Sequence, residues 1–86
     1  MYKRNDAFRW VHRENGAYIF SPIDGSVKVL NTTGSIITQL CEEMTPQQIA
    51  NRLQSDFDVE ESSEEITKDV EEYLSLLVRE GYLCQR

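Results

Sequence analysis

The spacing of apolar residues changes from two to about 3.6 near Asn31, and this change constrains the fold most. Before Asn31, apolar and polar residues alternate as in half-buried strands, and after it they recur at helical spacing. Asn15-Gly16 and Asp24-Gly25 are strong turn signals, because these residues tolerate the backbone conformations of tight turns. The strand candidates around these turns span residues 7–13, 17–21 and 26–30. Such short turns join antiparallel neighbours, so the sequence predicts a meander with the second strand in the centre.

The rest of the chain predicts three helices. Asn31 or Thr32 can cap the first, and Thr45-Pro46-Gln47-Gln48 has the form of a capping box with proline in the first turn. Gly81 ends the third helix. The helix candidates span residues 32–43, 46–57 and 63–80. We therefore expect an α+β fold, a three-stranded antiparallel meander followed by three helices, in one domain over residues 1–86.

Charge and hydropathy exclude several classes of function. Residues 31–86 carry twelve acidic and four basic residues, so the predicted helices would repel the phosphates of a nucleic acid. No apolar stretch approaches the ~20 residues of a membrane span, and no secretory signal is visible. Cys41 and Cys84 lie far apart in a chain with a single histidine, which favours two reduced thiols in the cytoplasm over a disulfide or a metal site. We expect no nucleic-acid or membrane partner.

The chain has no recognisable catalytic set. His12 is the single imidazole and stands on a strand between Arg9 and Arg13, so we expect a solvated surface residue. Cys41 has helical spacing with Ile37 and is expected to be a buried structural thiol. There is no glycine-rich phosphate loop, and the paired acidic residues lie on solvated helix faces. The sequence predicts a protein that is not an enzyme, with no catalytic residue, metal site or cofactor.

The two edges of the predicted meander differ in their protection. The first strand carries Arg9, Arg13 and His12, whereas the third, 26–30, has one charge and no proline. The unpaired backbone groups of this third strand can accept one more strand from an extended peptide. The alternative is that the third helix or a second copy of the chain covers this edge. Spacing leaves both alternatives open.

Three segments resemble one family. Residues 29–37, Val-Leu-Asn-Thr-Thr-Gly-Ser-Ile-Ile, are similar to the "LNxTGxxI" strand-to-helix junction of the PqqD-like family, the peptide recognition elements of ribosomal peptide modification systems. Residues 40–49 and 69–83 resemble two further segments of that family. The resemblance covers about residues 16–83. One departure is Glu42-Glu43-Met44, which stands one residue shorter in place of the usual Asp-Gly turn.

The resemblance implies a winged-helix-like fold that binds the N-terminal leader of a precursor peptide as a strand added to the third strand. It also implies delivery of the precursor to a tailoring enzyme, either a radical SAM enzyme or a leader peptidase or cyclase. Stand-alone members occur in lasso peptide and pyrroloquinoline quinone pathways, and the motif favours the lasso type. With the third helix as the facing wall, the peptide-binding residues expected are Val27, Lys28, Val29, Leu30, Asp69, Glu72, Tyr73 and Leu76.

Two other functions stay open at this stage. A winged-helix arrangement also suits a DNA-binding regulator, although the acidic third helix does not suit the major groove. The chain could instead be a structural subunit docked permanently on a larger enzyme.

Overall fold

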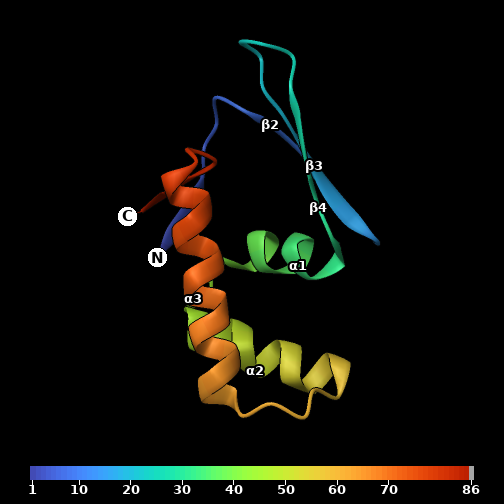
Figure 1. The fold of residues 1–86 in the computed structure, drawn as a ribbon, viewed down its shortest axis with the longest axis vertical. Coiled ribbons are helices and arrows are strands. Elements are labelled where there is room, and N and C mark those ends of the chain that lie inside the picture. The colour runs from blue at the N-terminus through green and yellow to red at the C-terminus, as the bar shows by residue number, and fades with distance from the viewer. Residues whose placement is uncertain (86) are drawn as a thin grey trace.

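The computed structural model describes residues 1–85, which form five strands and three helices. The strands are β1 (Tyr2–Arg4), β2 (Arg9–Arg13), β3 (Gly16–Phe20), β4 (Val27–Leu30) and β5 (Leu83–Gln85), and the helices are α1 (Thr32–Leu40), α2 (Pro46–Phe57) and α3 (Ser63–Arg79). The α+β class and the meander followed by three helices are confirmed (Figure 1). The winged-helix likeness stays a prediction. No helix in residues 1–85 has the length and apolar character of a membrane span.

The meander forms a three-stranded antiparallel sheet in the order β2-β3-β4, with β3 in the centre as predicted. Its side chains alternate between two faces. Ala17 and Ile19 on β3 are buried on the inner face, toward α1, whereas Tyr18 and Phe20 are exposed on the outer face. The inner face therefore supplies the part of the core that holds β4 beside the helices.

The helix starts follow the predicted caps. The Asn31 side chain accepts a hydrogen bond from the Gly34 amide at 2.8 Å, and Thr45 and Gln48 form the complete capping box of α2. The prediction for the end of α1 is wrong by three residues, because α1 ends at Leu40 rather than at residue 43. The amides of Glu43 and Met44 both donate to the Leu40 carbonyl, which turns the chain toward the extended cap at Thr45.

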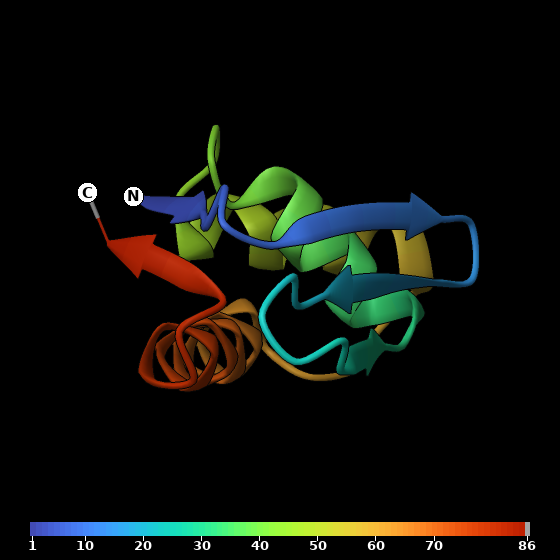
Figure 2. The same ribbon diagram turned by 90° about the horizontal axis from the view of Figure 1, so that it is seen from above.

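The main core lies between α2 and α3 and includes the inner residues of α1. On α3, Ile66, Val70, Leu74 and Leu77 are buried, as the predicted apolar stripe requires. Leu76 lies outside that stripe and is 43% exposed. Figures 1 and 2 show α1 against one face of the sheet and α3 running past its side.

The pairing of β1 with β5 is the element that the sequence did not predict. The register joins Tyr2 to Gln85 and Arg4 to Leu83, and both Tyr2 and Leu83 are buried. The strands lie side by side at one end of the molecule (Figure 2). Residues 83–85 are thus a strand attached to the core.

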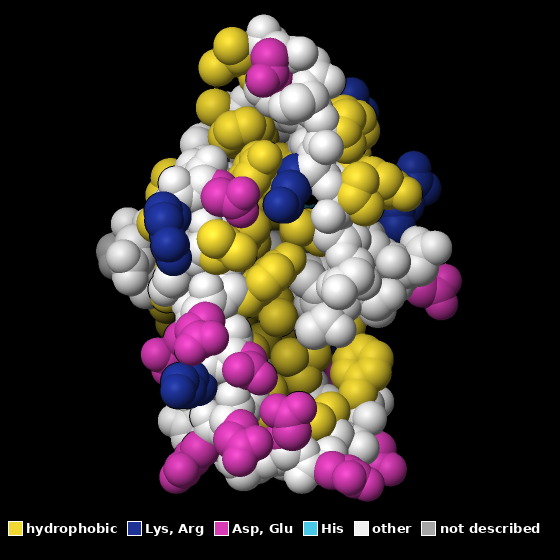
Figure 3. All heavy atoms as spheres, viewed as in Figure 1, with side chains coloured by type: hydrophobic (Ala, Val, Ile, Leu, Met, Phe, Trp, Pro, Cys, Tyr) yellow, Lys and Arg dark blue, Asp and Glu magenta, His cyan; other side chains and the backbone are white. Residues whose placement is uncertain are grey.

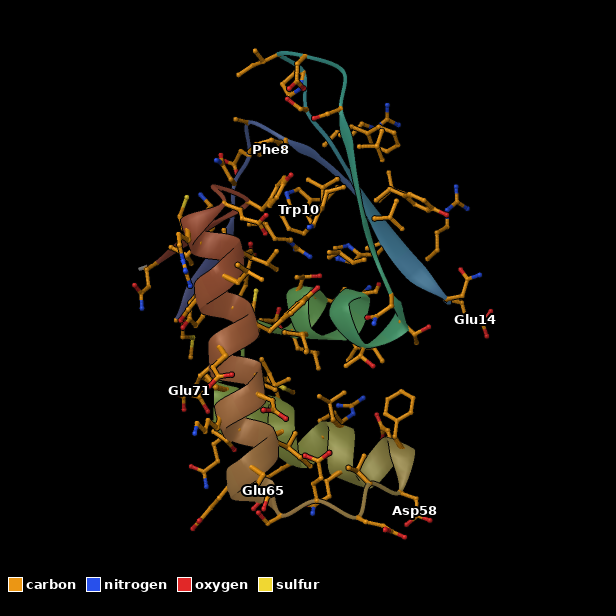
Figure 4. The ribbon with its side chains drawn as sticks, in the orientation of Figure 1. Phe8, Trp10, Glu14, Asp58, Glu65 and Glu71 are labelled. Carbon is orange, nitrogen blue, oxygen red and sulfur yellow. The ribbon has the colours of Figure 1, made fainter. Side chains whose placement is uncertain are left out.

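The expectation of a solvated His12 is wrong. Its Nε2 lies 3.1 Å from the Thr38 hydroxyl, and its ring stacks on Trp10 with 5.9 Å between the ring centroids. Figure 4 shows Trp10 on the side of the sheet that faces the helices. Because side chains on a strand alternate, His12 shares this inner face with Trp10. The pKa of His12 is lowered mainly by burial and, to a smaller extent, by the positive charge of Arg4.

Candidate functional site

The free edge of β4 is the first component of the site. Within residues 1–85, β4 pairs only with β3, and its outer side is open. Val29 is 63% exposed and Val27 is 47% exposed. The edge lacks the protection of a covering strand, so its backbone groups are available for pairing.

The alternation of hydrogen bonds along β4 indicates which backbone groups face outward. The Ser21 amide donates to the Ser26 carbonyl at 2.9 Å, so these two residues form a hydrogen-bonded pair. This pair lies next to the pair of Phe20 and Val27 in the ladder. Hydrogen-bonded and non-hydrogen-bonded pairs alternate in an antiparallel ladder. The N–H and C=O groups of Val27 and Val29 therefore point to the free edge, and those of Lys28 and Leu30 point to β3.

α3 supplies a wall beside this edge. Asp69, Tyr73, Leu76 and Glu80 follow one another at intervals of three and four residues, so they form one stripe along the helix and its cap. Tyr73 is half-buried and packs against the small cluster of Ala17, Ile19 and Leu30. Asp69 and Leu76 are exposed on the same stripe, and Glu72 is exposed on its flank.

Gly34 explains how closely α3 approaches the start of α1. A Cβ built on Gly34 would overlap the Tyr73 hydroxyl and would lie 3.2 Å from the Leu30 Cβ. A side chain at this position would displace Tyr73 from the junction of β4 and α1. The glycine of the strand-to-helix motif is thus needed for packing, and it fixes the position of the wall.

A hollow of about 410 Å³ lies next to the wall, where β4 passes into α1. Its floor is apolar and includes Ile37, Leu53 and Val70, and Phe57 lies at its margin. Figure 3 shows hydrophobic side chains gathered in a band alongside α3. A full list of the lining residues is Asn31, Thr33, Gly34, Ile37, Leu53, Phe57, Val59, Glu61, Ile66, Asp69, Val70 and Tyr73. The volume is within the range of small-ligand sites and suits a few apolar side chains.

A weak ion pair joins β4 to the upper end of the wall. Lys28 Nζ lies 3.9 Å from Glu80 Oε1, and both side chains are more than a third exposed. Exposed pairs of this kind contribute about 0–1 kcal/mol. The contact therefore gives little resistance to a peptide that separates the two side chains.

The structure brings most of the expected residues together. Lys28, Leu30 and Tyr73 lie on the inner side between β4 and α3, and Asp69 lies at the rim of the hollow. The side chains of Val27 and Val29 point to the other face, so these two residues can contribute their backbone edge. Glu72 and Leu76 are exposed on α3.

Several residues of the site were not predictable from the sequence. Phe57, Val59 and Glu61 come from the end of α2 and the turn after it, and Glu80 pairs with a residue of β4. Phe57 continues the spacing of Ile49 and Leu53, so its pattern is that of a core residue. Asn31 and Gly34 also line the hollow, and both belong to the strand-to-helix motif of residues 29–37. That motif is the one sequence feature that points to this part of the site.

Comparisons with known proteins find one matching family model and solved structures of similar fold. The family model described as coenzyme PQQ synthesis protein D (PqqD) matches residues 14–83. No curated protein matches the chain. A solved structure of "TbiB1 in Complex with the TbiA(beta) Leader Peptide" is similar with a TM-score of 0.79 and 21% identity, covering 98% of this chain and 96% of that one.

A second solved structure, "Lasso peptide synthetase B1 complexed with the leader peptide", has a TM-score of 0.81 and 19% identity and covers 98% of both chains. At these identities the likeness is one of fold, and it extends over 98% of this chain.

Proposed function

The chain belongs to the PqqD family, and on this premise we propose that it binds the leader segment of a ribosomally made precursor peptide and presents it to a modifying enzyme. The observation that carries the proposal is the unpaired edge of β4 beside the apolar hollow at α3. Strand addition uses backbone hydrogen bonds for affinity and side-chain pockets for specificity. This site offers both.

The comparisons support the class of ligand. The two solved structures of similar fold are complexes with a leader peptide, and one of them is a lasso peptide synthetase B1. We extend this ligand class to the present chain, together with a lasso-type pathway. The site residues that serve the leader are the backbone of Val27 and Val29 and the wall formed by Tyr73, Leu76 and Asp69.

The position of the hollow indicates which part of the leader would enter it, if the added strand is antiparallel to β4 as the family resemblance implies. The hollow lies at the C-terminal end of β4, where Asn31 and Gly34 line it. A strand that pairs antiparallel with β4 has its N-terminal end there. Leader residues that precede the paired segment therefore enter the hollow, and those that follow it pass Lys28 and Glu80.

The negative charge around the hollow and along the wall favours some leaders over others. Asp69 and Glu61 lie at the hollow, and Glu72 and Glu80 lie along the wall. Like charges across a contact cost free energy, whereas opposite charges favour encounter. We expect a leader whose apolar anchors are flanked by neutral or basic residues.

The proposed role is binding without catalysis, in the cytoplasm where the precursor is made. The modifying enzyme is a radical SAM enzyme or a leader peptidase and cyclase. Purified chain mixed with precursor alone should leave the precursor mass unchanged over hours. A reproducible mass shift without a partner enzyme would contradict this role.

The test of the binding site is fluorescence anisotropy with a labelled leader from the precursor gene next to that of this chain. Strand addition with a few apolar anchors gives about micromolar affinity, roughly −8 kcal/mol. Val29→Pro removes an amide that faces the free edge, so we expect binding to weaken about fivefold to tenfold. Val29→Ala keeps the amide and is the matched control, with affinity within about threefold of wild type.

Thermal melting of both variants checks that they fold. Equal leader affinity for wild type and a folded Val29→Pro variant would place the peptide elsewhere. No measurable leader binding by the wild-type chain would contradict the proposed function itself.

A further inference from the structure

The outer face of the sheet is a second exposed surface, on the side opposite the helices. The register aligns Arg9 with Phe20 and Val27 across the sheet, and Val11 with Tyr18 and Val29. Tyr18 and Phe20 are each 39% exposed, with 6.5 Å between their ring centroids. No other described element lies over this face (Figure 1). The outer face thus presents two aromatic rings and three valines to solvent.

Its charge is opposite to that of the rest of the molecule. Arg9 and Arg13 are exposed on β2 at the border of the outer face, and both line its shallow hollow together with Val11, Tyr18 and Phe20. No Asp or Glu of β2, β3 or β4 accompanies them, and neither arginine forms an ion pair within residues 1–85. By contrast, residues 31–86 carry a net charge of −8. The two guanidinium groups are therefore available to carboxylates of another molecule.

The composition of the outer face is that of a protein interface. Tyr, Phe and Arg are enriched at such interfaces, and Arg binds carboxylates through two parallel hydrogen bonds. A symmetric pair of these chains would place this face against the same face of the second copy, where β2, β3 and β4 offer no Asp or Glu to pair with Arg9 and Arg13. The charge pattern thus favours a different protein with acidic residues around an apolar patch.

We propose that the outer face of the sheet docks the modifying enzyme, through an apolar patch on that enzyme that is flanked by Asp or Glu. This inference rests on the proposed function for the existence of the enzyme. The leader lies between the edge of β4 and α3, whereas the docking residues point to the opposite face. Leader and enzyme therefore bind at the same time, which presentation requires.

The test uses the radical SAM enzyme, peptidase or cyclase whose gene neighbours that of this chain. Its affinity for the chain is measured by isothermal titration calorimetry, and leader affinity is measured separately by anisotropy. In the double variant Arg9→Glu/Arg13→Glu we expect enzyme affinity to fall at least tenfold and leader affinity to stay within about twofold. Raised salt should weaken the wild-type enzyme complex, because the contact includes charge pairs.

Two further variants make the result specific. Lys3→Glu/Lys68→Glu makes the same change of charge outside both surfaces and should leave enzyme affinity within about twofold. Tyr18→Ser/Phe20→Ser removes the aromatic part and should weaken the enzyme complex while the chain still binds its leader. Enzyme affinity that is unchanged in Arg9→Glu/Arg13→Glu, or reduced equally in the control, would overturn the proposal.

Self-association is the other outcome to examine. A wild-type chain that is dimeric by light scattering and becomes monomeric on Arg9→Glu/Arg13→Glu would assign the outer face to a second copy and overturn the proposal. Failure of leader binding by wild type, in the separate anisotropy measurement, would instead contradict the proposed function.

Discussion

At the scale of single residues, Gly34 has an effect larger than its size. The Tyr73 hydroxyl occupies the space that a Cβ at Gly34 would need. Tyr73 in turn packs against the cluster beneath β4. The absence of a Cβ at Gly34 therefore determines how closely α3 approaches β4. This contact gives a physical reason for glycine in the strand-to-helix motif.

We expect Gly34→Ala to destabilise the fold by about 1–2 kcal/mol. Overpacking costs about 1–3 kcal/mol, and the better helix propensity of alanine returns up to about 1 kcal/mol. The melting temperature should fall by about 4–8 °C per kcal/mol for a domain of this size. In a Tyr73→Phe background the overlapped hydroxyl is absent, so Gly34→Ala should cost clearly less. An equal cost in both backgrounds would contradict the packing role.

His12 predicts how stability depends on pH. Burial lowers its pKa in the folded state, so the unfolded chain binds the proton more readily. The stabilisation is present above the unfolded pKa of about 6.5 and is lost as the pH falls through the folded pKa. Melting temperatures between pH 7.5 and pH 5.5 should fall more for wild type than for His12→Gln, which keeps a donor toward Thr38. Parallel pH profiles would show that His12 does not contribute.

At the scale of elements, the start or end of a helix is predictable when residues close in sequence determine it. α2 begins and ends as predicted, at 46 and 57, because Thr45, Pro46 and Gln48 determine its start within four residues. The end of α1 depends instead on the turn that leads to Thr45, and the shortened Glu42–Met44 segment gave no local stop signal. The prediction of a solvated His12 is wrong because the alternation of side chains along β2 places His12 on the same face as Trp10.

The site divides in the same way. The edge of β4 and the stripe of α3 follow from strand order and helical period, so their residues could be named from the sequence. The hollow needs the ends of three helices to meet, and Phe57, Val59 and Glu61 have no local pattern that shows this. The Lys28–Glu80 pair joins residues 52 positions apart in the chain, and such a pair depends on tertiary structure alone.

The exposed part of α3 carries its own prediction. Leu76 is 43% exposed on the wall, so Leu76→Asp should change the melting temperature little. Loss of its apolar contact with the leader, about 1–1.5 kcal/mol, should weaken leader binding about tenfold. Ser75→Asp adds the same charge one residue away on the solvated side and is the control. An equal effect of both variants on leader anisotropy would assign the loss to charge alone.

At the scale of the whole molecule, acidic and basic residues are separated on the surface, and the two terminal strands pair with each other. The acidic helices and the arginines of β2 lie on different parts of the surface, so an encounter with a charged partner has a preferred orientation. β1 and β5 complete the core from the two ends of the sequence. Both proposed surfaces lie away from this pairing.

β5 should therefore behave as part of the core. Leu83 is 2% exposed, so Leu83→Ala should destabilise the fold by about 2–4 kcal/mol. Cys84→Ala, at the neighbouring exposed position of the same strand, should change stability by less than about 0.5 kcal/mol. Chemical denaturation of the two variants measures the difference. Similar values would mean that β5 does not contribute to the cooperative fold.

The register of β1 and β5 also determines how the chain responds to force. Tyr2 pairs with Gln85 at the open end of this ribbon, and Arg4 pairs with Leu83 further in. Tension applied to residues 2 and 85 pulls across the ladder, so the pairs separate one after another, as in a zipper, instead of sliding past each other together. The ribbon should therefore open at a lower force than sheared strands would, and because Tyr2 and Leu83 are buried in the main core, its opening starts the loss of that core.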